Sequence, residues 1–415
     1  MQSASDGPGV SARALALINE RQLAAELARL GVGPQAVAGL APCGVHANLL
    51  VSGLTAPVAA RLCQEAAAAR VVAAPPENRQ EPGRPPGELL LMGSLTAQRA
   101  LAAALRGAGP ELAALAPRLE GAIESFLLRR PWTISLPDGR LVEGGSRTLV
   151  MGIINLTADS FSGDGVACAE PRAIGEMAAR MVADGADLLD VGAESSRPGA
   201  APVTADEELA RLLPGLEAVL ARVSVPVSVD TYKAKVARAA IGDGAGIIND
   251  ITALHGDPQM AELAAELGAP LILMHMQGTP QTMQQHPEYR DLMSDVTASL
   301  AASMGMAAAA GVEVEQLVVD PGFGFGKTPE HNLELLRRLR ELRSLGRPIL
   351  VGTSRKSTIG KVLGDLPADQ RVEGTAATVA LAIAGGADIV RVHDVREMAR
   401  VAKMADAVVR GWPPP

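Results

Sequence analysis

Eight apolar runs in the C-terminal two thirds of the chain each end abruptly in polar or charged residues. The first covers residues 149–165, LVMGIINLTADSFSGDG, and is continuously apolar from Leu149 to Ile154. Such a run is typical of a strand that is buried on both faces. The other seven runs lie at residues 187–199, 225–233, 246–254, 270–278, 316–327, 348–357 and 387–395.

Segments with helical spacing, many of them rich in Ala and Leu, separate these runs. We expect helices at residues 173–184, 206–223, 258–267, 292–310, 331–345, 373–384 and 395–409. Eight alternations of buried strand and helix over roughly 265 residues predict an α/β fold of the (β/α)₈ TIM-barrel type. The alternative is a doubly wound open sheet, which usually has fewer strands and a Gly-rich dinucleotide turn after the first strand. No such turn is present here.

The first part of the chain, residues 1–130, predicts a separate small α/β module of unknown role, and the barrel is expected at 131–412. We expect helices at 20–30, 56–69, 96–106 and 111–128, strands at 46–54, 70–73 and 88–92, and a solvated loop at 75–87. The candidate reactive residues of the module are Cys43, His46 and Cys63, which we interpret as buried thiols and a core histidine. Between the two parts, Leu136-Pro137-Asp138-Gly139 indicates a hairpin turn that would plug the bottom of the barrel.

Composition limits the partners and the compartment. The net charge is −8, the pI is near 5.4, and there is no basic run, so nucleic acid and anionic membranes are disfavoured. The three cysteines are odd in number and lack metal-ligand spacing, which favours reduced thiols. Neither a signal peptide nor a membrane span is recognisable, and we therefore expect a soluble cytoplasmic protein.

The residues that follow the apolar runs fall into two chemical groups, which a barrel would bring to one mouth. Asp230, Asn249 and Asp320 offer acceptors and an amide suited to the edge of a flat heterocycle. A second, cationic group suits phosphate oxygens and comprises Arg197, Lys356, Arg391 and His393.

Aromatic residues are scarce, and most of the phenylalanines fall in the loops after strands. These are Phe161, Phe323 and Phe325, and Tyr232 is similarly placed. They either stack on a flat ligand or plug the mouth of the barrel. In the loop that follows Asp320, alternate glycines would let the backbone approach a ligand closely.

Ordered motifs carry a resemblance to a known family. The signature M-G-I-x-N-x-T-P-D-S-F matches Met151 to Phe161, and SSRPG, SVDTYK, IINDI, MHMQGTPQTMQ, DPGFGFGK, SRKS and RVHD follow in order. From about residue 132 to residue 412 the chain closely resembles the dihydropteroate synthases. These transferases join 6-hydroxymethyl-7,8-dihydropterin pyrophosphate to para-aminobenzoate in folate biosynthesis, on a (β/α)₈ barrel.

The resemblance implies a role for individual residues. Asp230, Asn249, Asp320 and Lys356 would hold the pterin, with Met274 and Phe325 against its ring. Asn155, Arg197, Arg391 and His393 would bind the pyrophosphate, Asn155 through Mg²⁺, and these four together with Lys356 form the expected catalytic set. Phe161, Ser196, Pro198 and Ser357 would frame the para-aminobenzoate site. A homodimer formed through the barrel and the role of a sulfonamide target are further implications.

The sequence departs from the family pattern at two positions. Ala158 replaces a usual proline, which puts the closure of the first loop in doubt. Ser196 replaces a common threonine but keeps its hydroxyl. Two rival functions remain open at this point: a corrinoid-linked pterin methyltransferase, which has no use for the pyrophosphate cluster, and a non-catalytic pterin-binding homologue.

Overall fold

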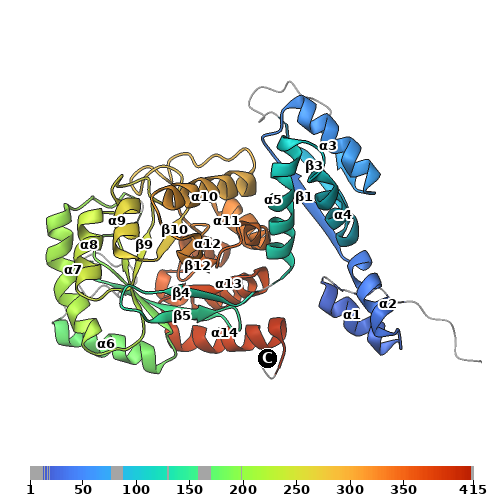
Figure 1. Ribbon diagram of the computed structural model, residues 1–415. Coiled ribbons are helices and arrows are strands. Elements are labelled where there is room, and N and C mark those ends of the chain that lie inside the picture. The colour runs from blue at the N-terminus through green and yellow to red at the C-terminus, as the bar shows by residue number, and fades with distance from the viewer. Residues whose placement is uncertain are drawn as a thin grey trace, which may run out of the picture. The chain divides into compact units, whose positions relative to one another are not determined.

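The computed structural model describes residues 13, 15, 17, 19–75, 87–128, 130–157, 170–197 and 199–412. It divides into two compact units, Met1–Leu127 and Leu128–Pro415 (Figure 1). Ala158, Phe161, Cys168 and Pro198 lie outside the described residues.

The N-terminal unit is a small α/β structure, as predicted. Its described strands form an antiparallel sheet in the order β1-β3-β2, and its core contains Leu62, Leu91, Leu101 and Leu112. Its elements are α1 (Glu20–Arg29), α2 (Pro34–Leu40), a 3₁₀ helix (Ala41–Gly44), β1 (His46–Val51), α3 (Ala56–Ala68), β2 (Val72–Ala74), β3 (Leu89–Ser94), α4 (Leu95–Leu105) and α5 (Pro110–Leu127).

Two of the expected core residues of this unit are in fact exposed. Cys43 lies at the surface in the 3₁₀ helix, and Cys63 is half-buried. His46 begins β1, where side chains alternate between exposed and buried positions, and it falls on the exposed face. The expectation of buried thiols and a core histidine was therefore wrong for Cys43 and His46.

In the C-terminal unit, eight described strands form one parallel sheet in the order β11-β10-β9-β8-β7-β6-β13-β12. A parallel bridge between Val319 and Ile349 joins the two ends of this order, so the sheet closes into the predicted barrel. The strands are β6 (Leu149–Asn155), β7 (Leu188–Gly192), β8 (Val227–Asp230), β9 (Ile247–Asp250), β10 (Leu271–Met274), β11 (Leu317–Asp320), β12 (Leu350–Val351) and β13 (Ile389–Val392).

Helices follow the strands around the outside of the barrel (Figure 1). The start of α7 shows how local sequence fixes their ends, because Thr204 and Glu207 form a reciprocal capping box there. The helices are α6 (Pro171–Ala183), α7 (Ala205–Leu220), α8 (Ala234–Gly242), α9 (Met260–Leu267), α10 (Leu292–Ala309), α11 (Pro329–Arg337), α12 (Ser357–Val362), α13 (Val372–Gly385) and α14 (Val395–Arg410), with 3₁₀ helices at Val314–Gln316, Leu339–Leu345 and Ala368–Gln370.

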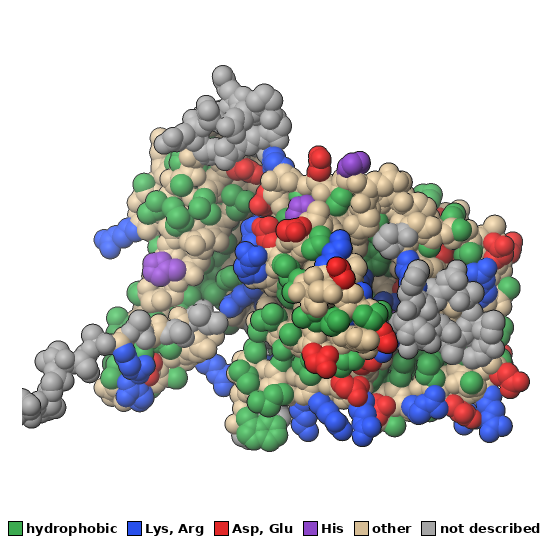
Figure 2. Space-filling view, turned by 180° about the vertical axis from the view of Figure 1, so that it is seen from behind, with side chains coloured by type: hydrophobic (Ala, Val, Ile, Leu, Met, Phe, Trp, Pro, Cys, Tyr) green, Lys and Arg blue, Asp and Glu red, His purple; other side chains and the backbone are tan. Residues whose placement is uncertain are grey.

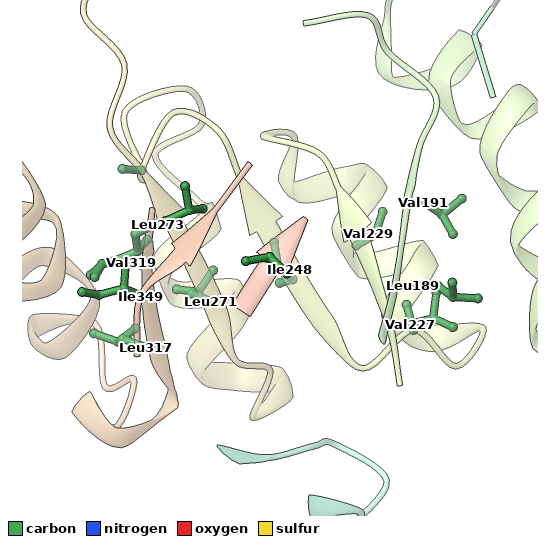
Figure 3. Close-up of a cluster of buried hydrophobic side chains, with 14 of the residues drawn as sticks. Leu189, Val191, Val227, Val229, Ile248, Leu271, Leu273, Leu317, Val319 and Ile349 are labelled. Carbon is green, nitrogen blue, oxygen red and sulfur yellow. The ribbon is translucent and has the colours of Figure 1, made fainter. Parts of the chain in front are cut away.

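Alternation along the strands divides the apolar residues into two cores. Outward-facing residues such as Val191, Val229 and Leu273 pack against the helices (Figure 3). Inward-facing residues at the amino ends of the strands, such as Leu149 and Ile389, form the second core inside the barrel.

The predicted hairpin plugs this second core from below. It consists of β4 (Trp132–Ser135) and β5 (Leu141–Gly144), and its Ile134, Leu136 and Val142 belong to the inner cluster. Gly139 takes a φ of +85° in the turn between the strands, a conformation that favours glycine. Apolar side chains thus fill the lower end of the barrel interior, and a ligand inside the barrel is expected at the opposite, carboxyl end.

Candidate active site

Inward-facing positions turn polar at the carboxyl ends of the strands. The strand register places Asn155 beside Gly192, Gly192 beside Asp230, and Asp230 beside Asn249. On the other side of the barrel, Met274 pairs with Asp320. Because all of these strands are parallel, their last residues form one ring at the mouth.

Asp190 is the centre of a charged network that forms the floor of this mouth. Its fully buried carboxylate accepts hydrogen bonds from Arg391 Nε (2.6 Å), from Asn249 Nδ2 (3.1 Å) and from the Ser228 hydroxyl. A second nitrogen of Arg391, Nη2, donates to Asp230 Oδ2 at 2.8 Å. One guanidinium thus bridges two carboxylates, a role for which the fixed fork of N–H donors suits arginine.

The same network orients the side-chain amide of Asn249. One N–H of its Nδ2 donates to Asp190, which orients the amide and leaves its carbonyl oxygen and its second N–H for other partners. The buried Asp190 therefore fixes which face of the amide is available at the mouth.

Burial shifts the proton affinity of the two carboxylates nearest the mouth. It raises the pKa of Asp230 to about 7, assisted by the charge of Asp190 and opposed by that of Arg391. Burial likewise raises the pKa of Asp320, although the backbone N–H of Gly322 donates to its Oδ1 at 2.7 Å. An ionised carboxylate that is buried in this way costs free energy unless a ligand or a cation binds to it.

Lys356 approaches the mouth from the loop after β12. Its ammonium donates to the Phe323 carbonyl at 3.0 Å and lies 3.9 Å from the centre of the Phe325 ring. Burial lowers its pKa to about 7, against the opposing effect of Asp320. Phe325 is half-buried at the mouth, whereas Phe323 is 1% exposed and belongs to the outer core. The aromatic residues were expected either to stack on a flat ligand or to plug the mouth of the barrel. Phe323 is of the second kind, because its ring packs in the core.

A second lysine, Lys327, holds the glycine-rich loop from within. Its buried Nζ donates to the carbonyls of Gly322 and Phe325, both at 3.0 Å, and lies 2.9 Å from His275 Nδ1. Burial lowers the pKa of Lys327 to about 7 and that of His275 to about 3. Gly322 has a φ of +67°, and a Cβ there would lie 1.9 Å from the His275 carbonyl oxygen, so this position requires glycine.

His393 follows β13 on the same face as Arg391. Its Nδ1 lies 3.0 Å from Ser354 Oγ, which also accepts from the His393 backbone N–H at 3.2 Å. Burial and the charges of Arg391 and Arg355 lower the pKa of His393 to about 3, so the imidazole is neutral at physiological pH.

The remaining predicted residues divide between those that are described and those that are not. Ser196 and Arg197 are half-buried in the loop after β7, and Ser357 is exposed at the start of α12. Phe161 and Pro198 lie outside the described residues. Sequence reasoning missed Asp190 and Ser228, although an acid at an inward position of a buried strand is a recognisable signal.

Asn155 is the candidate ligand for Mg²⁺. In the described part of the chain, no group of three or more His, Cys, Asp or Glu side chains is arranged to hold a metal ion. Mg²⁺ often takes only one or two side-chain oxygens and completes its shell with water and substrate phosphates. A single amide oxygen at the end of β6, half-buried at the rim, fits that type of site.

Two surface features bear on partners. On the face of the barrel that Figure 2 shows, acidic and basic side chains are interspersed rather than gathered by sign. None of the helices described here has the length and apolarity needed to cross a bilayer.

Comparison with known proteins matches this geometry to one family. The sequence profile described as "Pterin binding enzyme" matches residues 151–393, which is more than half of the chain. This chain belongs to the pterin-binding enzyme family. The dihydropteroate synthase of Synechocystis is 49% identical over 276 residues, which cover 66% of this chain and 95% of that protein.

Solved structures agree. A sulfonamide complex of the Yersinia pestis dihydropteroate synthase is 44% identical, with a TM-score of 0.64, and the match covers 66% of this chain and 98% of that chain. The Thermus thermophilus enzyme matches over 66% of this chain in its complexes with 4-aminobenzoate (46% identity, 99% of that chain, TM-score 0.59) and with 6HMPPP (44% identity, 98% of that chain, TM-score 0.56). The activity of this pterin-binding enzyme is therefore that of a dihydropteroate synthase, a transferase of folate biosynthesis, rather than that of a corrinoid-linked methyltransferase or a non-catalytic homologue.

Proposed function

We propose that the barrel mouth condenses 6-hydroxymethyl-7,8-dihydropterin pyrophosphate with para-aminobenzoate, releasing 7,8-dihydropteroate and pyrophosphate. The observation that carries this proposal is the single polar layer in which Arg391 bridges Asp190 and Asp230 while Lys356 lies over Phe325. This layer offers acceptors for a heterocycle and cations for an anion at one end of the barrel. Complexes of the relatives with 4-aminobenzoate and 6HMPPP support the choice of substrates.

In this proposal the pterin lies on the acidic floor. Asp230 and Asp320 accept its N–H groups, and Asn249 presents the carbonyl oxygen that Asp190 leaves available. Met274 and Phe325 contact the faces of the ring, and Lys356 donates to its acceptors. Burial of these groups strengthens each hydrogen bond and excludes water from the heterocycle.

The chemistry is a displacement at the pterin methylene carbon. The carbon–oxygen bond to pyrophosphate breaks, the oxygen keeps the electron pair, and the arylamine nitrogen forms the new bond and then loses a proton to solvent. Arg197, Arg391 and His393 stabilise the departing anion, which gains charge as the bond breaks. His393 contributes by donating a hydrogen bond from its ring to the departing oxygens.

Mg²⁺ at Asn155 would add Lewis-acid stabilisation of the pyrophosphate oxygens when bound. Asn155 itself orients the leaving group from the end of β6. Ser196, Ser357, Phe161 and Pro198 frame the para-aminobenzoate, with the two serine hydroxyls available to its carboxylate. The reaction needs no covalent intermediate with the enzyme.

We further propose a cytoplasmic homodimer formed through the barrel. Large apolar side chains on neighbouring helices are exposed, among them Leu381 (58%) on α13 and Met404 (65%) and Val408 (74%) on α14. Exposed apolar residues of this kind are typical of protein interfaces. The free thiols Cys43 and Cys63 are in keeping with a reducing compartment.

Mass-spectrometric detection of dihydropteroate tests the proposal. The full chain with Mg²⁺, the pterin pyrophosphate and para-aminobenzoate should form the product, whereas 6-hydroxymethylpterin without pyrophosphate should bind but give none. Absence of product from folded protein that binds the pterin would contradict the proposed activity.

A further inference from the structure

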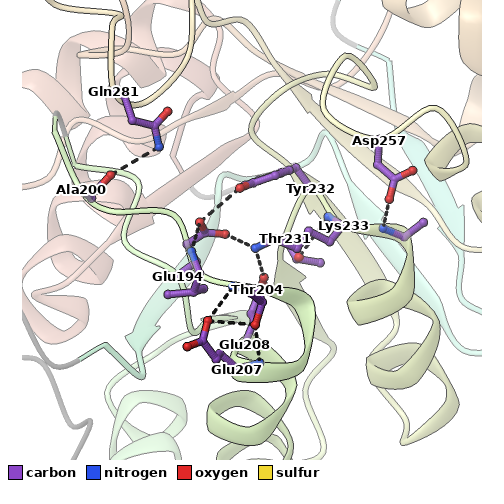
Figure 4. Close-up of polar contacts among 12 residues, drawn as sticks. Glu194, Ala200, Thr204, Glu207, Glu208, Thr231, Tyr232, Lys233, Asp257 and Gln281 are labelled. Carbon is purple, nitrogen blue, oxygen red and sulfur yellow. Dashed lines mark hydrogen bonds and ion pairs between the residues drawn. The ribbon is translucent and has the colours of Figure 1, made fainter.

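A buried charge cluster lies beside the mouth and has no part in the chemistry described above (Figure 4). Lys233, at the start of α8, donates from Nζ to Glu194 and, at 2.6 Å, to Glu208 Oε2. The three side chains are 15%, 11% and 0% exposed, respectively. Burial raises the pKa of the Glu208 carboxyl, while Lys233 and the Thr231 side chain oppose that rise. Charges this deeply buried cost free energy, so the cluster calls for an explanation.

Glu194 links the two ends of one loop. It lies just after β7, and its Oε1 accepts from the backbone N–H of Val203, at the far end of the same loop, at 3.2 Å. The Tyr232 hydroxyl donates to the same oxygen at 3.2 Å. The carboxylate thereby ties the β7–α7 loop both to itself and to the β8–α8 loop, and Lys233 neutralises it.

The middle of the β7–α7 loop is held from the opposite side. The Gly199 backbone N–H donates to the Pro280 carbonyl at 3.3 Å, and Gln281 Nε2 lies 3.4 Å from the Ala200 carbonyl. Ser196 and Arg197 thus lie between two anchored stretches of one loop. The same segment lines a small pocket with Asp230 and Tyr232.

We infer that Lys233 is a positioning residue for the second substrate: through Glu194 it fixes the loop that presents Ser196 to para-aminobenzoate and Arg197 to the leaving group. The inference rests on the proposed function. The ammonium of Lys233 is taken up by Glu194 and Glu208, so Lys233 acts through the loop that Glu194 holds. Its removal should therefore affect the para-aminobenzoate KM and kcat while leaving pterin binding nearly unchanged.

Lys233→Met is the primary test, with steady-state kinetics for para-aminobenzoate and calorimetry for 6-hydroxymethylpterin. A displaced loop should lower kcat/KM for para-aminobenzoate roughly 10–100-fold, as small misplacements of reacting groups do. Pterin affinity should change by less than about threefold, within the range of small non-contacting perturbations. The matched control is Lys235→Met, which breaks an exposed ion pair with Asp206 between the same two helices and should leave both measurements unchanged.

A double variant separates positioning from stability. Lys233→Met alone leaves Glu208 buried without a cation and lowers the melting temperature. Lys233→Met/Glu208→Met removes both buried charges and should recover most of that loss. The defect toward para-aminobenzoate should persist in the double variant, because Glu194 still lacks Lys233. Recovery of kcat/KM together with stability would overturn the inference and leave Lys233 a purely structural residue.

A double-mutant cycle of Lys233→Met with Arg197→Ala completes the test. If Lys233 acts through the loop, Lys233→Met should cost clearly less in the Arg197→Ala background than in the wild type. Strictly additive effects both here and in the matching cycle with Ser196→Ala would also overturn the inference. Failure of the proposed function would look different, since the wild-type protein itself would then give no product with para-aminobenzoate.

Discussion

Replacement of Asp190 by asparagine is the most informative perturbation of the barrel floor. The substitution keeps the volume of the side chain but converts one carboxylate oxygen into an N–H₂ donor. Its three partners, Arg391 Nε, Asn249 Nδ2 and the Ser228 hydroxyl, are all donors to Asp190. Arg391 Nε and Asn249 Nδ2 share Oδ2, and the Ser228 hydroxyl, which also contacts the Leu189 carbonyl at 3.4 Å, can accept from the new N–H₂ group. The remaining amide oxygen must then serve Arg391 and Asn249 without a negative charge.

The magnitude follows from burial. Asp190 is fully buried, and it neutralises Arg391 together with Asp230. Because Arg391 keeps Asp230 as its partner, no charge is left unpaired, and the loss of the second carboxylate should cost about 1.5–3 kcal/mol of stability, the range for a hydrogen bond to a charged group. Asn249 then donates to a neutral oxygen that it shares with Arg391, which loosens the orientation of its amide and should weaken pterin binding by about 1 kcal/mol, the difference between a hydrogen bond to a charged and to a neutral acceptor.

Two assays separate these effects. Urea unfolding measures the loss of stability, and calorimetry with 6-hydroxymethylpterin under native conditions measures the loss of affinity. Asp187→Asn is the matched control, because Asp187 immediately precedes the same strand, pairs with the half-exposed Arg147, and lies at the opposite end of the barrel. It should leave pterin affinity unchanged.

Unchanged pterin affinity in a folded Asp190→Asn protein would refute the reasoning, because Asn249 would then not depend on Asp190 for its orientation. An equal loss in Asp187→Asn would refute it as well, since the effect would follow from the charge of strand β7 rather than from the floor.

Three further predictions follow from the same geometry. Arg391→Ala should lower kcat/KM roughly 10²–10³-fold, as loss of a charge-stabilising donor does. It should also lower the free energy of unfolding in urea, because Asp190 and Asp230 then remain buried without their cation. Near-normal turnover would contradict the pyrophosphate role of Arg391. His393, with a folded pKa of about 3, should show no NMR titration between pH 5 and 8. The unfolded chain binds a proton at His393 near the ordinary pKa of 6.5, whereas the folded chain does not. The free energy of unfolding should therefore fall as the pH is lowered below 6.5, and His393→Gln should reduce this fall. Deletion of residues 1–127 should leave kcat for the synthase reaction largely intact, because Leu128–Pro415 forms a compact unit of its own, and loss of kcat in a folded truncated protein would argue against this.

The barrel could be predicted from the sequence because its strands are buried on both faces. Such strands read as continuous apolar runs with an abrupt polar end, and eight of them recur with helices between them. The surface of the N-terminal unit was harder to predict. Whether Cys43 and His46 face the core depends on the register of a short, half-exposed strand and its preceding turn, and composition does not report that register.

The glycine-rich loop marks another limit of the sequence. Phe323 and Phe325 are two residues apart, as are residues on one face of a strand, yet one lies in the core and the other at the mouth. Gly322 and Gly324 take positive φ values of +67° and +86°, which turn the backbone and cancel the alternation rule. Asp190 was missed for a different reason. It lies one inward position below the rim, so a search confined to strand ends passes over it.

The stoichiometry of pyrophosphate release tests the central claim most directly. Purified full-length protein is supplied with Mg²⁺ and the pterin pyrophosphate, and pyrophosphate is followed with and without para-aminobenzoate. The assignment predicts one pyrophosphate released for each para-aminobenzoate consumed, and little release without the arylamine. Release that does not depend on para-aminobenzoate, or no release at all from folded protein that binds the pterin, would contradict it.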